Sequence, residues 1–244
     1  MFRLIFFLAA LTTPQLQKIG QQIWENESHR SAEKLIFWNP REAFPSLGIG
    51  HFIWYHEKEQ APFEETFPQL IQFLSDHQAK IPNWLQNIQN CPWKTREEFL
   101  SNPNDLKIQE LRSLLLETID LQTLFMYERF RETEKKIIQA AENPKKIQKL
   151  LQQLVKTPQG PYALIDYTNF KGTGLSVKER YKNQGWGLLQ VLETMPDDPT
   201  SEQAVKAFVS SAKEVLSLRV QNAPSDQTQW LKGWHARLDT YLKF

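Results

Sequence analysis

The feature that most constrains the fold is one short region with the pattern of a β-strand, Leu47 to Tyr55, in a chain otherwise rich in helical patterns. Gly48 and Gly50 alternate with apolar residues, so the backbone can run as a strand with bare sites on one face. In a regular strand Ser46 shares that face with the two glycines, and His51 lies on the other. A strand face that carries a hydroxyl group and no bulky side chain is suited to line the bottom of a cleft. The alternative is a glycine-weakened strand in a small sheet.

The other periodic segments predict helices. They cover residues 14–27, 63–74, 105–142 (one long helix or a helical pair), 147–154, 162–171, 184–192, 200–218 and 227–242, the last with Trp230 on its buried face. A short helix is expected at residues 95–98 inside the proline-rich stretch 82–104, because Thr95 and Glu98 have capping-box spacing. A mostly helical chain with one small sheet predicts the α+β class.

An acid on the first helix has the position that acid catalysis requires. Ile19, Ile23 and Trp24 recur on one face, and at about 100° per residue Glu27 falls in the middle of it. Glu25 points to the opposite side. A carboxyl among apolar side chains is costly to ionise, so we expect its pKa to be raised, as a general acid needs. The alternative is that the helix ends before Glu27 and that the acid caps the helix or faces solvent.

Composition excludes several classes of function. The net charge is +1, from 29 basic and 28 acidic residues, so the overall charge gives no electrostatic attraction toward nucleic acid. Cys91 is alone, so the chain cannot form an internal disulfide. The five histidines include no helical pair four residues apart, so we expect neither a metal site nor a cofactor. Eight tryptophans and fifteen phenylalanines suit a packed helical core and also carbohydrate stacking.

The N-terminus resembles an export signal. Arg3 precedes the apolar run from Leu4 to Leu11, which has the length of a secretory h-region and is too short to span a bilayer. We therefore predict a signal-like segment at residues 1–13, no integral membrane span, and an exported protein, periplasmic or secreted from a bacterium. The alternative is a buried N-terminal segment. We expect residues 14–244 to form a single domain and the protein to be a monomer.

The segment Ser46-Leu47-Gly48-Ile49-Gly50-His51 resembles the Thr-Ile-Gly-x-Gly-His segment of phage-type lysozymes, the endolysin muramidases. Residues 163–174 look like the central helix and glycine-marked turn of that family, and residues 219–241 look like its closing helices. The resemblance covers residues 16–56 and 160–241. It implies a lysozyme-like fold with a small β-hairpin lobe and a larger helical lobe, in which residues 57–158 are an enlarged helical insertion.

The resemblance also implies roles for individual residues. Glu27 takes the position of the general acid, and Ser46 that of a hydroxyl that orients the attacking water. His51 supports the site. The family has an aspartate a short distance before that hydroxyl, where this chain has Asn39, so the nearest candidate for a second carboxylate is Glu42.

The substrate-binding residues that we predict are Gly48, Gly50, His51, Trp54 and Asn169.

These observations predict a glycoside hydrolase of the muramidase type that cleaves the glycan strands of bacterial peptidoglycan. Two alternatives stay open. One is a lytic transglycosylase that works through Glu27 alone, which the likeness of Gly187-Leu188-Leu189-Gln190 to a Gly-Leu-Met-Gln segment of those enzymes favours. The other is a non-catalytic peptidoglycan-binding protein on a degenerate lysozyme scaffold. A chitinase- or chitosanase-like activity on a related fold is a further possibility.

Overall fold

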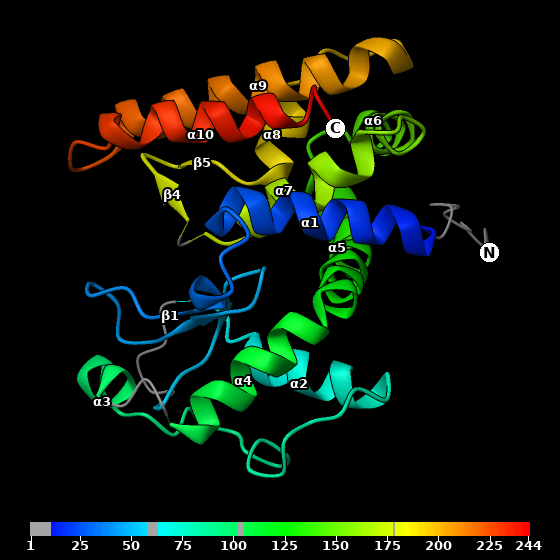
Figure 1. Cartoon of the computed structure of the whole chain (residues 1–244). Helices are drawn as coiled ribbons and strands as arrows, with labels where there is room; N and C mark the ends of the chain where they lie inside the picture. Colours follow the sequence, from blue (N-terminus) through cyan, green and yellow to red (C-terminus); the bar gives the residue numbers. More distant parts are fainter. Residues whose placement is uncertain (1–10, 58–62, 102–104, 178) are drawn as a thin grey trace. The chain divides into compact units, whose positions relative to one another are not determined.

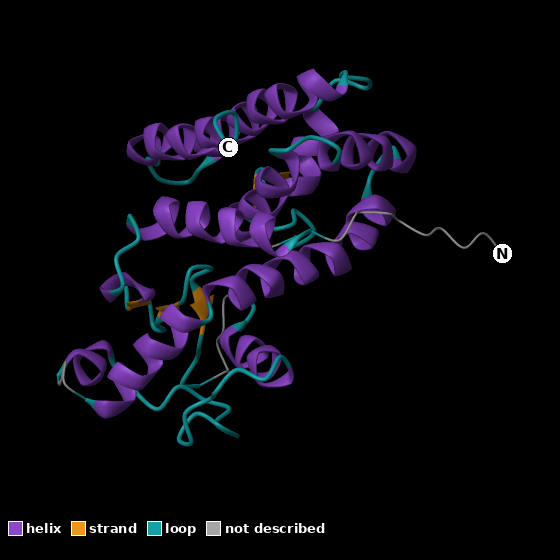
Figure 2. Ribbon diagram, turned by 45° about the vertical axis from the view of Figure 1, so that its right-hand side comes forward, coloured by secondary structure: helices purple, strands orange, loops and turns teal. Residues whose placement is uncertain are grey.

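The computed structural model describes residues 11–57, 63–101, 105–177 and 179–244 (Figures 1 and 2). These residues form two compact units, Leu11–Met126 and Tyr127–Phe244. The boundary lies inside helix α5 (Ile119–Ala140), which therefore contributes to both units. Residues 57–158, expected to be an insertion, are divided between the units at that boundary. A single domain over residues 14–244 stays a prediction.

In the first unit, helix α1 (Thr13–Ser28) forms where the apolar period predicts it. Thr12 caps the first turn, and its backbone N–H donates to Oε1 of Gln15 over 2.9 Å. Ile23 is fully buried. His29 ends the helix in the left-handed conformation, with φ at 52°. The helix therefore continues through the position of the predicted acid.

Three short strands form an antiparallel sheet in the order β1–β2–β3. Their bounds are Ile36–Phe37, Ser46–Leu47 and Phe52–Ile53, and a 3₁₀ turn, η1, precedes them at Glu33–Leu35. Leu47 of the central strand pairs with Ile36 on one side and with Phe52 on the other, and all three are buried. The sheet thus places one apolar layer in the core of the first unit.

The chain turns between β2 and β3, so the continuous strand predicted from Leu47 to Tyr55 is wrong in its middle. Gly48 has φ +69° and His51 has φ 49°, both in the left-handed region. The N–H of His51 donates to the carbonyl of Gly48 over 3.3 Å, and the N–H of Gly48 donates to the carbonyl of Leu35 over 2.7 Å. The alternation of faces therefore ends at Leu47, and Ser46 does not share a strand face with the glycines.

Gln122 of α5 holds this turn from inside the unit. Its side chain is fully buried, Oε1 accepts the N–H of Ile49 over 2.9 Å, and Nε2 donates to the carbonyl of Leu115 over 2.7 Å. A Cβ at Gly48 would collide with the Gln122 amide. Glycine at this position therefore serves both the positive φ and the close approach of a buried amide.

Three further helices complete the first unit. They are α2 (Phe67–Asp76), α3 (Arg96–Leu100) and α4 (Leu106–Glu117). Helix α2 packs beside β3, and α4 packs beside β1 (Figure 1). The capping spacing at Thr95 is confirmed, because its Oγ1 accepts the N–H of Glu98 over 3.2 Å. Helix α2 starts later than predicted: Phe63 is 51% exposed and lies before it.

The proline-free stretch 105–142 forms a helical pair, α4 and α5, one of the two predicted arrangements. The break is at Thr118, whose ψ of 21° leaves the helical range. Its buried hydroxyl donates to the carbonyl of Leu114 over 2.7 Å. The side chain thus satisfies a carbonyl at the end of α4.

The second unit is built mainly of helices. Besides its part of α5, it contains α6 (Pro144–Val155), α7 (Gly160–Lys171), α8 (Leu188–Thr194), α9 (Ser201–Asn222) and α10 (Thr228–Thr240). Helices α9 and α10 lie side by side along their length (Figures 1 and 2). Thr200 and Gln203 form the predicted capping box of α9.

Two predictions for this unit are wrong. The helix expected at residues 184–192 begins only at Leu188, because β4 (Arg180–Tyr181) and β5 (Gln184–Gly185) form a hairpin before it. Lys182 and Asn183 make its turn with φ of 49° and 64°, as two-residue hairpins require. Trp230, expected in the buried face of the last helix, is 52% exposed.

The coarse prediction is confirmed: the protein is mostly helical with small antiparallel sheets (Figure 2). Among the described residues, no helix combines the length and the apolar character that a bilayer crossing requires. The predicted signal segment contains an apolar run, and the part of this run up to residue 10 lies outside the described residues.

Candidate functional site

The candidate site begins with Glu27 in the last turn of α1. Its side chain is only 13% exposed, and its Oε2 lies 3.4 Å from Nδ1 of His51. The last turn of a helix carries carbonyl groups whose partial negative charge disfavours another negative charge nearby. The helix therefore ends with a mostly buried carboxyl beside one imidazole.

The turn between β2 and β3 delivers His51 to this carboxyl. The imidazole is 37% exposed, so it contacts both Glu27 and solvent. Histidine tolerates the left-handed φ of 49° better than most residues, and this conformation turns the chain after Gly50. The glycine-rich turn thus contributes to the site by positioning the side chain of His51.

Glu42 supplies a second acid from the loop between β1 and β2. Its N–H donates to the carbonyl of Asn39 over 3.0 Å, and its carbonyl accepts the indole N–H of Trp38 over 2.8 Å. Burial raises the pKa of the Glu42 carboxyl above its ordinary 4.5, while the positive charge of His51 lowers it. His51 therefore interacts electrostatically with Glu42 and lies 3.4 Å from Glu27.

This arrangement can move protons. The Glu27 carboxyl lies 3.4 Å from the His51 imidazole, so the two groups are close enough to exchange a proton. Glu42 adds a carboxylate that can accept one. In the described part of the chain, no group of three or more His, Cys, Asp and Glu side chains is placed to hold a metal ion. Burial raises the pKa of the Cys91 thiol to about 12, which leaves no thiolate nucleophile at neutral pH.

Three other predicted residues, Ser46, Gly48 and Gly50, lie in β2 and in the turn that follows it. Ser46 is 9% exposed in β2, and its hydroxyl has no hydrogen bond to Glu27 or His51 among the described residues. Gly48 and Gly50 are buried, and a Cβ at Gly50 would lie 2.7 Å from Cε1 of Phe52. The glycines face the protein interior, so we assign them to the turn rather than to substrate contact.

The remaining two predicted residues lie elsewhere. Trp54 is fully buried, its indole N–H donates to the carbonyl of Gln89 over 3.3 Å, and its ring centroid is 4.7 Å from that of Phe67. It is a core residue with no face open to a sugar. Asn169 belongs to α7 of the second unit, where it is half-buried.

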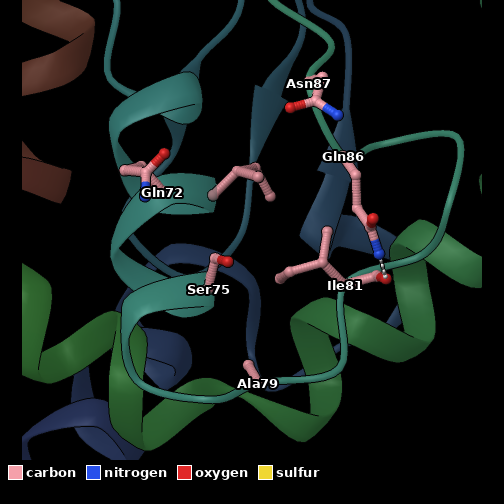
Figure 3. A pocket seen from close by; sticks show the side chains of 7 residues that line it. Gln72, Ser75, Ala79, Ile81, Gln86 and Asn87 are labelled. Atoms are coloured by element: carbon pink, nitrogen blue, oxygen red, sulfur yellow. Dashed lines mark hydrogen bonds between the residues drawn. The ribbon is translucent and has the colours of Figure 1, made fainter.

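A pocket of about 240 Å³ in the first unit was not predicted (Figure 3). Its lining residues are Ile71, Gln72, Ser75, Ala79, Ile81, Gln86 and Asn87. Gln86 donates from Nε2 to the carbonyl of Ile81 over 3.1 Å (Figure 3). None of these side chains titrates near neutral pH, so the pocket can bind through amide and hydroxyl groups but cannot transfer a proton. No motif in the sequence points to it.

Comparison of the chain with protein-family models, with curated protein sequences and with solved structures gave no match.

Proposed function

We propose that this protein is a glycoside hydrolase of the glycan strands of bacterial peptidoglycan, with Glu27 as the general acid. The observation that carries the proposal is the 13% exposed carboxyl of Glu27, 3.4 Å from His51, on the last turn of α1. The likeness of residues 46–51 to the lysozyme segment supports the substrate class. Export, predicted from residues 1–13, brings the protein to this polymer.

In the proposed mechanism, Glu27 gives its proton to the glycosidic oxygen as the bond to the anomeric carbon breaks. Water adds to that carbon, and Glu42 takes its proton. His51 then restores the proton balance between the two acids. The turn at Gly48–His51 and the indole of Trp38 hold these groups in place, which supports catalysis by positioning.

The experiment that tests this proposal is product analysis. Purified peptidoglycan is incubated with the full-length protein, and the soluble fragments are identified by liquid chromatography and mass spectrometry. We expect fragments with free reducing-end sugars. Anhydro-sugar ends would indicate that the enzyme follows the lytic transglycosylase route instead of hydrolysis. Glu42 need not take part in that route. Tight binding to sacculi without soluble products would contradict an enzyme and favour the non-catalytic alternative.

A histidine variant tests the electrostatics of the site. If Glu42 must be ionised, activity rises as pH passes its pKa, which burial keeps above 4.5. Removing the positive charge of His51 raises this pKa further, because that charge lowers it. We therefore expect His51→Asn to move the acidic limb of the kcat/KM profile to higher pH.

The matched control is His29→Asn. His29 also has a positive φ, 52°, but its side chain is 84% exposed and pairs with Glu25. Its profile should stay at the wild-type position. If the acidic limb does not move in His51→Asn, the charge of His51 does not affect the pKa of the group that sets this limb.

A further inference from the structure

The pocket of the first unit lies between helix α2 and the segment that follows it. Figure 3 shows Gln72 and Ser75 on the helix and Gln86 and Asn87 on the opposite side of the pocket. Its volume is about 240 Å³. Pockets for drug-sized ligands have volumes of about 300–1,000 Å³, so this pocket suits one small ring rather than a long ligand.

Backbone hydrogen bonds and one buried side chain fix the two sides of the pocket. Helix α2 ends in a Schellman motif, in which Gln78 has φ of 63° and the N–H of Ala79 donates to the carbonyl of Leu74 over 2.9 Å. On the other side, the side chain of Leu85 is fully buried. Asn87 follows it with φ of 63°, a left-handed conformation that asparagine tolerates. A fixed frame reduces the entropy that is lost when a ligand binds.

Four exposed polar side chains line the pocket, so a ligand can reach their hydrogen-bonding atoms: Gln72, Ser75, Gln86 and Asn87. Nε2 of Gln72 donates to Oδ1 of Asp76 over 2.8 Å, and Nε2 of Gln86 donates to a backbone carbonyl of the pocket wall over 3.1 Å. These bonds orient the two amides and leave each Oε1 as an acceptor. Among the described residues, the Ser75 hydroxyl and the Asn87 amide form no hydrogen bond, so both can donate and accept.

The other lining residues are aliphatic: Ile71, Ala79 and Ile81. A pyranose ring has C–H groups on its faces and hydroxyl groups around its edge, so it can use aliphatic and polar contacts together. No charged side chain of the described residues lines the pocket. An ion bound here would lose hydration without gaining a counter-charge from the lining. The pocket therefore suits a neutral ring better than a charged one.

We propose that this pocket binds one neutral saccharide ring, with Ser75 and Asn87 as the residues that hydrogen-bond its hydroxyl or amide groups. Glu27 and His51 are not among the lining residues, so the pocket holds a sugar without cleaving it. The preference for a neutral ring follows from the lining. The choice of N-acetylglucosamine as the probe rests on the proposed function, because peptidoglycan is rich in N-acetyl sugars.

The test is an NMR titration of the isotope-labelled, full-length protein with N-acetylglucosamine. We expect amide chemical shifts of residues 71–87 to change and to give a Kd. Asn87→Gly removes the side-chain amide, while glycine readily keeps the positive φ. We expect it to weaken binding by about tenfold, because the hydrogen bonds of one neutral amide are lost. The matched control is Asn183→Gly, an exposed asparagine with φ of 64° in the turn between β4 and β5, which should bind as the wild type does.

A second variant tests the helix side of the pocket. Ser75→Ala removes one hydroxyl from an exposed position of α2, and alanine favours the helix, so the fold is kept. We expect binding to weaken by about three- to tenfold, the effect of one neutral hydrogen bond. Its control is Ser210→Ala, an exposed serine of α9, which should leave the Kd unchanged.

A charged sugar tests the preference for a neutral ring. Glucosamine has the same ring as N-acetylglucosamine, but an ammonium group replaces the acetamide. We expect it to bind more weakly, because the lining offers no counter-charge. Asp76 is the acid that hydrogen-bonds a lining residue, Gln72. Tighter binding of glucosamine than of N-acetylglucosamine would overturn the preference and indicate that the Asp76 carboxylate attracts a cation.

The map of shifted residues separates this site from the proposed function. Unchanged shifts at residues 71–87, or equal affinity of Asn87→Gly and Asn183→Gly, would overturn the pocket as a saccharide site. Shifts confined to the surroundings of Glu27 and His51 would overturn the pocket and support the proposed function. Binding at residues 71–87 by a protein that leaves sacculi intact would keep the pocket and overturn the proposed function.

Discussion

Replacing Glu27 with glutamine should lower the rate of glycan cleavage by about 100-fold or more, because general acid catalysis contributes roughly that factor. Glutamine has nearly the same shape and remains compatible with the last turn of α1, but it cannot give a proton to the leaving oxygen. The measurement is the initial rate of release of reducing ends from purified peptidoglycan at a fixed pH. Binding of the polymer should be retained, so the loss should fall on kcat rather than on KM.

The matched control is Glu25→Gln, two positions earlier in the same helix. Glu25 is 43% exposed and pairs with Arg30 over 3.3 Å and with His29 over 3.4 Å. Its variant should cleave at nearly the wild-type rate, which separates the chemistry of one carboxyl from a general change in helix charge. Equal rates for Glu27→Gln and wild type would remove Glu27 from the mechanism, and with it the main argument for a hydrolase.

The position of Glu27 could be predicted from the sequence because it depends on one helix only. The period of Ile19 and Ile23 defines a buried face, and α1 is long enough to carry that face through Glu27. Its contact with His51 depends on the turn between β2 and β3, three elements later. Helical period contains no information about that turn, and only the likeness to a known segment pointed to it.

The failures have a common physical cause. A strand through Gly48 and Gly50 fits the alternation of residue types, but Gln122, more than seventy positions away, accepts the N–H of Ile49 and fixes a turn instead. The buried amide of Gln122 therefore determines the backbone conformation at this position more strongly than the alternation of residue types does. In the same way, Trp54 has the residue type of a sugar platform, yet its surroundings come from distant aromatic residues that no local pattern reveals.

The β4–β5 hairpin differs from the helix predicted at residues 184–192. Its strands, Arg180–Tyr181 and Gln184–Gly185, have two residues each, which is too short for an alternating pattern to show in the sequence. The turn at Lys182 and Asn183 was the missed signal, since two residues of left-handed conformation close a hairpin.

Stability of the second unit should depend strongly on Asp166 of α7. This carboxylate is fully buried, and its two oxygens accept from Arg237 of α10: Oδ2 from Nε over 2.9 Å and Oδ1 from Nη2 over 2.8 Å. The hydroxyl of Tyr241 donates to Oδ2 over 2.6 Å. Because the Arg237 side chain is only 9% exposed, Asp166→Ala leaves a buried charge without its carboxylate. We expect a loss of about 3–5 kcal/mol in the free energy of unfolding, measured by urea denaturation.

Two comparisons decide whether this loss comes from the orphaned charge. The control Asp198→Ala removes an acid that pairs with Lys149 over 2.8 Å, but the two side chains are 65% and 52% exposed, so its urea midpoint should change little. The double variant Asp166→Leu with Arg237→Met removes both buried charges and should be more stable than Asp166→Ala. A double variant no more stable than Asp166→Ala would mean that the loss does not come from the unpaired charge of Arg237 and would leave the hydroxyl of Tyr241 as its source. In that case Tyr241→Phe should reproduce the loss, because Asp166 then matters as the acceptor for one buried hydroxyl.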